Sequence, residues 1–150
     1  MTEQAETPRS REKLEALFEA YRCTSFCADT PAGRLRIRVG ERSGALDALL
    51  AAHAVRTWAY ITAWNPGSVA LSESENRSRQ QALESELGAR GLPVFRGEGI
   101  GDDGRWSPEP SVLVLGLSEA DGRALGARFG QIAIVAGELQ GPARLVACEN

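Results

Sequence analysis

The sequence predicts an α+β fold, a single-domain α/β sandwich with a ferredoxin-like βαββαβ core and an N-terminal helix–hairpin–helix extension. From residue 57 onward, apolar patterns typical of strands and helices follow one another in the order β-α-β-β-α-β. The 150 residues match the usual size of one domain, and such a chain buries enough surface to fold without disulfides or metals. We therefore predict one domain over residues 1–150, with the core at 57–147 and a disordered tail at 1–7.

The first 56 residues predict a helix, a two-stranded hairpin and a second helix that extend or cover the core sheet. In the first helix, apolar residues recur at helical spacing: Leu14, Leu17, Phe18 and Tyr21. Residues 22–28 and 34–39 have the pattern of strands. Apolar residues in the second of these strands alternate with arginines that we expect on a solvated face: Arg34, Arg36 and Arg38. Ser43 begins the second helix.

Seven further segments complete the predicted fold. We expect strands at 57–64, 93–99, 111–117 and 131–136, helices at 72–90 and 118–129, and an edge strand at 144–148. Trp58, Tyr60 and Trp64 alternate along the first of these strands, a pattern that also suits base stacking in RNA-recognition sheets. Because the strand at 111–117 offers no matching aromatic residues and the chain is acidic, we expect the three aromatic side chains in the core.

Composition and charge argue against several classes of protein. Asp and Glu (20) outnumber Lys and Arg (17), which gives a net charge of −3, whereas a general nucleic-acid binder is usually basic. No apolar run approaches the roughly 20 residues that a membrane span needs. The first six residues are polar and acidic, unlike a signal peptide. We therefore expect a cytoplasmic protein that binds neither membranes nor nucleic acid.

The cysteines and the histidine do not have the spacing of a metal site. Cys23, Cys27 and Cys148 form no disulfide framework. With His53 as the only histidine, they also lack the four suitably spaced ligands of a structural zinc site. The sequence therefore predicts no metal and no cofactor, and it leaves a homodimer open.

Polar residues that packing does not explain converge at one end of the predicted sheet. In the split β-α-β topology, the same end collects five segments, namely 64–68, 72–79, 97–99, 106–111 and 129–131. Asn76 and Gln80 lie on the apolar stripe of their helix, where buried polar groups need partners. The connection 99–110 is also long for a hairpin in a compact domain. We therefore predict a site at this end.

The residue types suggest roles within that site. Glu109 and Glu75 are the candidate catalytic residues, because burial can raise the pKa of a carboxyl group toward neutrality. The candidate ligand-binding residues are Trp64, Asn65, Asn76, Arg79, Trp106, Ser111 and Gln131. Amide and guanidinium groups bind polar atoms, and either tryptophan can stack on a planar ligand. An alternative for Glu75 is a capping box with Ser72.

One string of motifs runs through the second half of the chain. It consists of 61–66 (Ile-Thr-Ala-Trp-Asn-Pro), Glu75-Asn76, Gly97-Glu98-Gly99, Trp106, Glu109, Ser111 and Phe129-Gly130-Gln131. In these motifs and their order the chain resembles the bacterial domain-of-unknown-function family numbered 3293, over nearly its whole length. The resemblance implies a compact bacterial cytosolic domain and supports the choice of motif residues. The family often has Asn where this chain has Ile132, so a polar role there would fall to Gln131 alone.

Two functions remain open from the sequence. The first is a site for a small polar ligand at one end of the sheet, with catalysis undecided. The alternative is a non-catalytic protein-interaction or regulatory module, in which the same motifs form a structural network. Nucleic-acid binding would need a local patch of arginines. The arginines that could form such a patch are better explained as residues on solvated faces.

Overall fold

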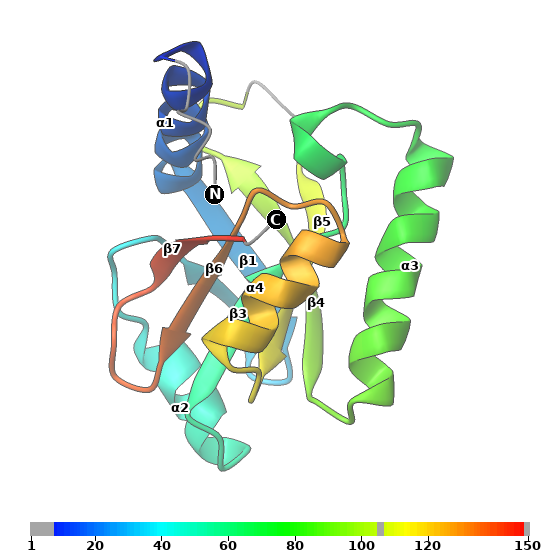
Figure 1. Cartoon of the computed structure of the whole chain (residues 1–150). Coiled ribbons are helices and arrows are strands. Elements are labelled where there is room, and N and C mark those ends of the chain that lie inside the picture. Colours follow the sequence, from blue (N-terminus) through cyan, green and yellow to red (C-terminus); the bar gives the residue numbers. More distant parts are fainter. Residues whose placement is uncertain (1–7, 105–106, 149–150) are drawn as a thin grey trace, which may run out of the picture.

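The computed structural model describes residues 8–104 and 107–148 (Figure 1). Within these ranges the chain is a mixed α/β protein with four α-helices and a seven-stranded sheet. Its elements, in order, are α1 (Pro8–Arg22), β1 (Thr24–Thr30), β2 (Gly33–Ile37), α2 (Gly44–Ala52), β3 (Thr57–Ile61), a 3₁₀ turn (Pro66–Ser68), α3 (Glu73–Ala89), β4 (Val94–Gly101), β5 (Glu109–Leu115), α4 (Glu119–Arg128), β6 (Ala133–Glu138) and β7 (Arg144–Ala147).

The strands pair in the order β2-β1-β4-β5-β3-β6-β7, and each neighbouring pair is antiparallel. The predicted order of helices and strands is confirmed. The hairpin between β4 and β5 is longer than predicted, because pairing continues to Gly99 opposite Glu109 and the loop shrinks accordingly. β3 ends at Ile61, which is earlier than predicted. At the next residue a side chain replaces the strand pairing, because the hydroxyl of Thr62 donates to the carbonyl of Pro110 (2.7 Å).

The sheet curls until its two edges meet. Beyond β2, Val39 forms an isolated parallel bridge with Ala143, the residue before β7. Gly40 N–H donates to the Ala143 carbonyl (2.8 Å), and Ala143 N–H donates to the Glu41 carbonyl (3.0 Å). The sheet therefore has an enclosed inner face and an outer face. In Figure 1, α1 lies at the upper end of the curl and α2 at the lower end.

Alternate residues of the strands build a core on each face, as the two-residue period of a strand requires. The inner core includes Phe26, Ile37, Trp58, Tyr60, Leu113 and Val135, with Leu46 and Leu50 of α2 packed among them. The outer core includes Ile61, Val112, Val114 and Ile134, covered by Leu83 and Leu87 of α3 and Leu125 of α4. Trp58 and Tyr60 thus lie in the core, as predicted, whereas the prediction for Trp64 is wrong, because it follows the end of β3 and is only half-buried.

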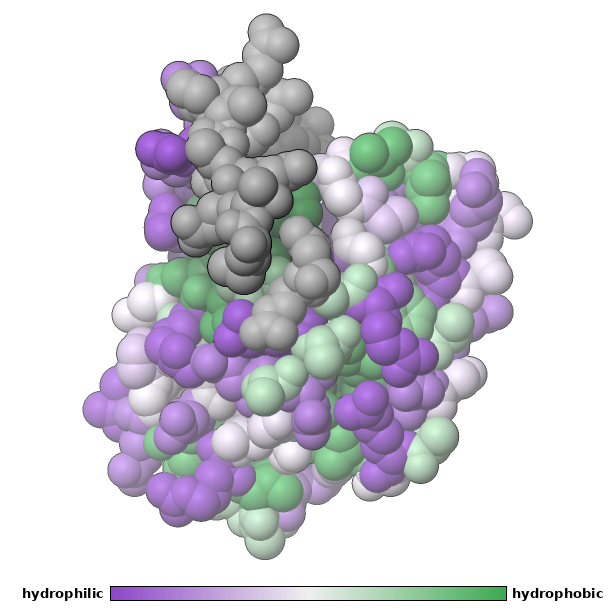
Figure 2. All heavy atoms as spheres, viewed as in Figure 1, coloured by the Kyte–Doolittle hydropathy of each residue, from purple (hydrophilic) through white to green (hydrophobic). Residues whose placement is uncertain are grey.

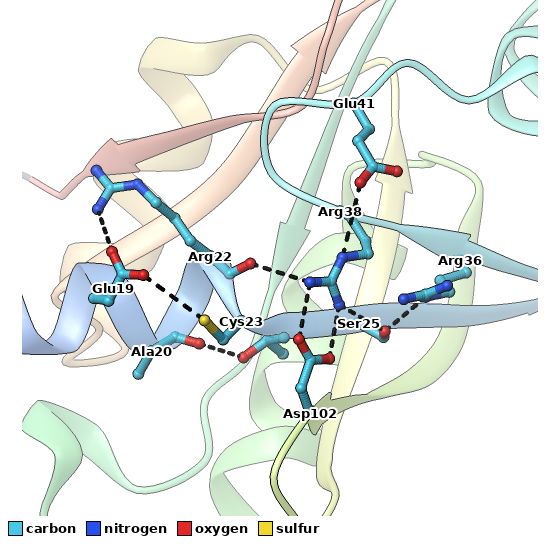
Figure 3. A network of polar contacts seen from close by, with 10 residues as sticks. Glu19, Ala20, Arg22, Cys23, Ser25, Arg36, Arg38, Glu41 and Asp102 are labelled. Atoms are coloured by element: carbon cyan, nitrogen blue, oxygen red, sulfur yellow. Dashed lines mark hydrogen bonds and ion pairs between the residues drawn. The ribbon is translucent and has the colours of Figure 1, made fainter.

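Arg38, just after β2, joins three parts of the chain (Figure 3). Its guanidinium makes a two-pronged contact with the carboxylate of Asp102, at 2.7 and 2.9 Å. It also donates to the hydroxyl of Ser25 (3.2 Å) and to the carbonyl of Arg22 (3.4 Å). The guanidinium holds the pKa of Asp102 below its usual range. This part of the predicted arginine face is therefore an ion-pair network that ties β1, β2 and the turn after β4 to the end of α1.

Figure 2 shows hydrophilic side chains spread over most of the described surface on this side of the molecule. Among the described residues, no helix combines the length and the apolar character that crossing a membrane requires.

Candidate functional site

The polar motifs lie together at the end of the sheet where β3 ends and β6 begins. Arg79 of α3 links two of the segments, because its Nε donates to the Ala63 carbonyl (3.1 Å) and its Nη2 to the Phe129 carbonyl (2.5 Å). Gln131 Nε2 donates to the Trp64 carbonyl (3.2 Å). The chain after β3 is thus held both by α3 and by the segment before β6.

Asn65 and Asn76 bind each other through two hydrogen bonds. Asn65 N–H donates to Oδ1 of Asn76 (2.8 Å), and Nδ2 of Asn76 donates to Oδ1 of Asn65 (2.7 Å). Asn65 has a left-handed backbone (φ 44°), a conformation that asparagine tolerates better than most residues. Asn76 is 2% exposed, so this pairing gives its amide the partners that burial demands.

Gln80, one turn further along α3, is only partly satisfied. Its Oε1 accepts a hydrogen bond from the N–H of Ala63 (2.9 Å). Its Nε2 is fully buried, and no partner for it is found among the described residues. A buried amide with one unused donor is uncommon in native proteins.

Glu75 stands apart from this cluster. Glu75 is exposed, and it belongs to the cap of α3: Ser72 Oγ accepts from Glu75 N–H (3.1 Å) and donates to Oε1 of Glu75 (2.9 Å). Trp106 lies outside the described residues.

A cavity of about 980 Å³ opens at the same end of the sheet. Six of the predicted site residues line it, namely Trp64, Asn65, Asn76, Glu109, Ser111 and Gln131. Glu75 and Arg79 are not in its lining. Sequence reasoning missed the contribution of α1, which adds Leu17, Ala20 and Tyr21. The apolar stripe of α1 was the available signal, but such a stripe looks the same whether it packs on a core or lines a cavity.

Glu109 is the distinctive group in this cavity. It begins β5 opposite Gly99, which brings no side chain, so space remains beside the carboxyl group. Burial raises the pKa of Glu109 to about 7. Among the described residues, no hydrogen bond or ion pair to its carboxyl group is found. The group is therefore able to take up or release a proton near neutral pH.

Two tyrosines flank the cavity. Burial, with a smaller contribution from the charge of Glu109, raises the pKa of Tyr21 to about 12. Burial also raises the pKa of Tyr60, whose hydroxyl donates to the Cys27 carbonyl (2.7 Å). Both tyrosines therefore stay neutral in the usual pH range. No group of three or more His, Cys, Asp or Glu side chains that could hold a metal occurs in the described part of the chain.

Residues 61–134 match the family described as "Protein of unknown function (DUF3293)". This match places residues 61–134 of the chain in the DUF3293 family. Comparison with curated proteins and with solved structures gives no match.

The DUF3293 match contains the polar cluster almost whole. It starts at the last residue of β3 and ends within β6, so it includes the Asn65–Asn76 pair, Glu109 and Gln131. It is shorter than the resemblance indicated, because α1, α2 and the strands β1, β2 and β7 lie outside it. The cavity is thus built by the DUF3293 segment together with side chains from outside it, such as Tyr21 and Phe26.

Proposed function

We propose that this DUF3293 protein binds a small molecule in the cavity at the end of the sheet, with Glu109 as the central polar group. The observation that carries the proposal is a half-buried carboxyl group facing a cavity, with no partner among the described residues. Leaving such a group unpaired costs stability, and a ligand that pairs with it would recover that cost. Gln80, whose buried Nε2 has no partner among the described residues, belongs to the same lining.

The candidate residues divide into two groups. Trp64, Glu109, Ser111 and Gln131 line the cavity and are proposed to contact the ligand. Asn65, Asn76 and Arg79 act as positioning residues, because the two asparagines bind each other and Arg79 binds the backbone of the segment after β3. That segment carries Trp64 and forms part of the cavity wall. Should the bound molecule react, we assign proton transfer to Glu109, whose pKa suits it.

We also propose that β3 to β6 form a ferredoxin-like core. Its support is the strand order β4-β5-β3-β6, in which each helix connects two strands that are not neighbours. On this proposal, β1, β2 and β7 extend the core sheet on either side until it curls. Nothing in the described residues favours the interaction-module alternative.

The test is a titration with indole, a neutral planar probe, followed by backbone amide shifts. We expect shifts to concentrate at Tyr60, Ser111 and Gln131. The blocking variant is Gly99→Leu, because a Cβ at Gly99 would lie 3.7–3.9 Å from its nearest neighbours, in ordinary contact, and a longer side chain would fill the cavity. The matched control is Gly88→Leu on α3, where a Cβ meets no atom within 4 Å.

The two variants give opposite expectations. Gly99→Leu should weaken indole binding at least tenfold, whereas Gly88→Leu should leave it unchanged. Equal binding by both variants, or shifts that map away from the cavity, would show that the cavity is not the site.

A further inference from the structure

The charges of the cavity lining do not balance. Among the described residues the lining holds three carboxylates and two guanidinium groups. Arg77 pairs with Glu73 and Arg96 pairs with Glu84, each at 2.7 Å. Glu73 and Glu84 are thus each paired with an arginine. Among the described residues of the lining, Glu109 is the remaining carboxyl group, and no arginine there pairs with it.

Aromatic rings surround the same cavity. Tyr21, Phe26, Tyr60 and Trp64 all contribute to its lining. Phe26 lies between the two tyrosines, with ring centroids 6.5 Å from Tyr21 and 5.3 Å from Tyr60. Because the tyrosines stay neutral, their ring faces keep the negative quadrupole that attracts cations. Aromatic faces beside one carboxylate are the chemistry by which proteins hold organic ammonium groups.

We propose that the cavity binds an organic cation, an amine or quaternary ammonium group on a small apolar body, with its nitrogen against Glu109 and its body among the aromatic rings. This proposal rests on the proposed function and names the class of its ligand. An anion would meet an uncompensated carboxylate. A neutral ligand of the same shape would bury its apolar body equally well but would leave the carboxylate unpaired.

Binding and protonation are coupled in this arrangement. A bound cation favours the ionised carboxyl group, so the cation should bind more tightly as the pH rises past 7. Tyr21 of α1 is the titratable neighbour of Glu109, and it stays neutral across that range. The charged groups of α3 and β4 in the lining are already paired.

The experiment compares three probes of similar shape: protonated benzylamine, neutral benzyl alcohol and anionic benzoate. Each is titrated into the full chain at pH 8 and low salt, followed by calorimetry and backbone amide shifts. We expect benzylamine to bind at least tenfold more tightly than benzyl alcohol, and benzoate to bind more weakly than either. At pH 5 the preference for benzylamine should fall to a few-fold.

Glu109→Gln keeps the shape of the side chain and removes its charge. It should abolish the preference for benzylamine while the affinity for benzyl alcohol stays within about twofold. The matched control is Glu138→Gln, which changes an exposed carboxylate at the far end of β6 and should keep the full preference.

The outcomes separate the two proposals. Equal affinities of the wild type for benzylamine and benzyl alcohol, or tightest binding of benzoate, would overturn the cation proposal and leave the ligand site standing. The same holds if Glu109→Gln retains the preference. Absence of binding by all three probes and by indole would overturn both proposals.

Discussion

Asn76 and Asn65 hold the first turn of α3 against the chain that leaves β3, through two hydrogen bonds of 2.7 and 2.8 Å. The same Asn65 side chain accepts from Leu71 N–H (3.1 Å), so one amide also fixes the approach to the helix. Two asparagines thereby set the position of Trp64 and of one wall of the cavity.

Asn76→Ala should destabilise the fold by about 2 kcal/mol, because it leaves the N–H and Oδ1 of Asn65 without these partners in a half-buried place. Urea denaturation measures the change. Ser78→Ala, on the exposed side of the same helix, is the control and should change stability by less than about 0.5 kcal/mol. Equal stabilities of the two variants would mean that the asparagine pair contributes little.

Glu109→Gln should change how stability depends on pH. Because burial raises the pKa of Glu109 from 4.5 to about 7, the folded chain holds this proton more tightly than the unfolded chain does. The stabilising effect of the proton is complete below about pH 4.5 and is lost as the pH rises to about 7. Above that, the wild type carries a penalty of at most about 3 kcal/mol, which glutamine avoids.

Urea denaturation at pH 5 and pH 8.5 checks this prediction. Glu109→Gln should be nearly as stable as the wild type at pH 5 and more stable at pH 8.5. Glu138→Gln should show no such pH-dependent gain. A variant that is less stable than the wild type at pH 8.5 would show that the carboxylate has a favourable partner in the fold.

Gly126→Ala and Gly88→Ala should change stability in opposite directions. A Cβ at Gly126 of α4 would lie 2.6 Å from Sγ of Cys148 and 2.9 Å from Cγ2 of Ile134, so the helix must move from the sheet, at about 1–3 kcal/mol. At Gly88 of α3 nothing lies within 4 Å, and alanine should stabilise the helix by about 0.5–1 kcal/mol. Thermal melts measure whether each variant is more or less stable than the wild type. A Gly126→Ala variant that is more stable than the wild type would contradict the close packing of α4 on the sheet.

Ser72→Ala should cost about 1 kcal/mol, because it removes the side chain that caps the N-terminus of α3. The control is Ser74→Ala, which changes an exposed serine two residues further along the same helix. Urea denaturation measures the stability of both variants. Since Glu75 acts in this cap and does not line the cavity, Ser72→Ala and Glu75→Gln should both leave indole affinity unchanged. A weakened affinity in Glu75→Gln would return that residue to the binding site.

Part of the polar cluster at this end of the sheet could be predicted from the sequence. Asn76 and Gln80 attract attention because they interrupt an apolar stripe, and both are buried. The contribution of Tyr21 to the cavity lining was not predictable, because an apolar stripe on a helix has the same spacing whether it faces a core or a cavity. The contact of Arg38 with Asp102 was equally hidden, because alternation shows that an arginine leaves the core but not which carboxylate it meets.

Local periodicity and turn chemistry, which depend on neighbours a few residues apart, determined the helices and strands, their order, and the convergence of polar motifs at one end of the sheet. Only the tertiary structure decided which of those motifs bind backbone and which face a cavity. The curl that closes at Val39 and Ala143 rests on backbone hydrogen bonds between distant segments, which leave no pattern in side-chain types. The tertiary structure also places Tyr21 of α1 and Glu109 of β5 in the lining of one cavity, which leaves Glu109 half-buried, whereas Glu75 in the cap of α3 is exposed.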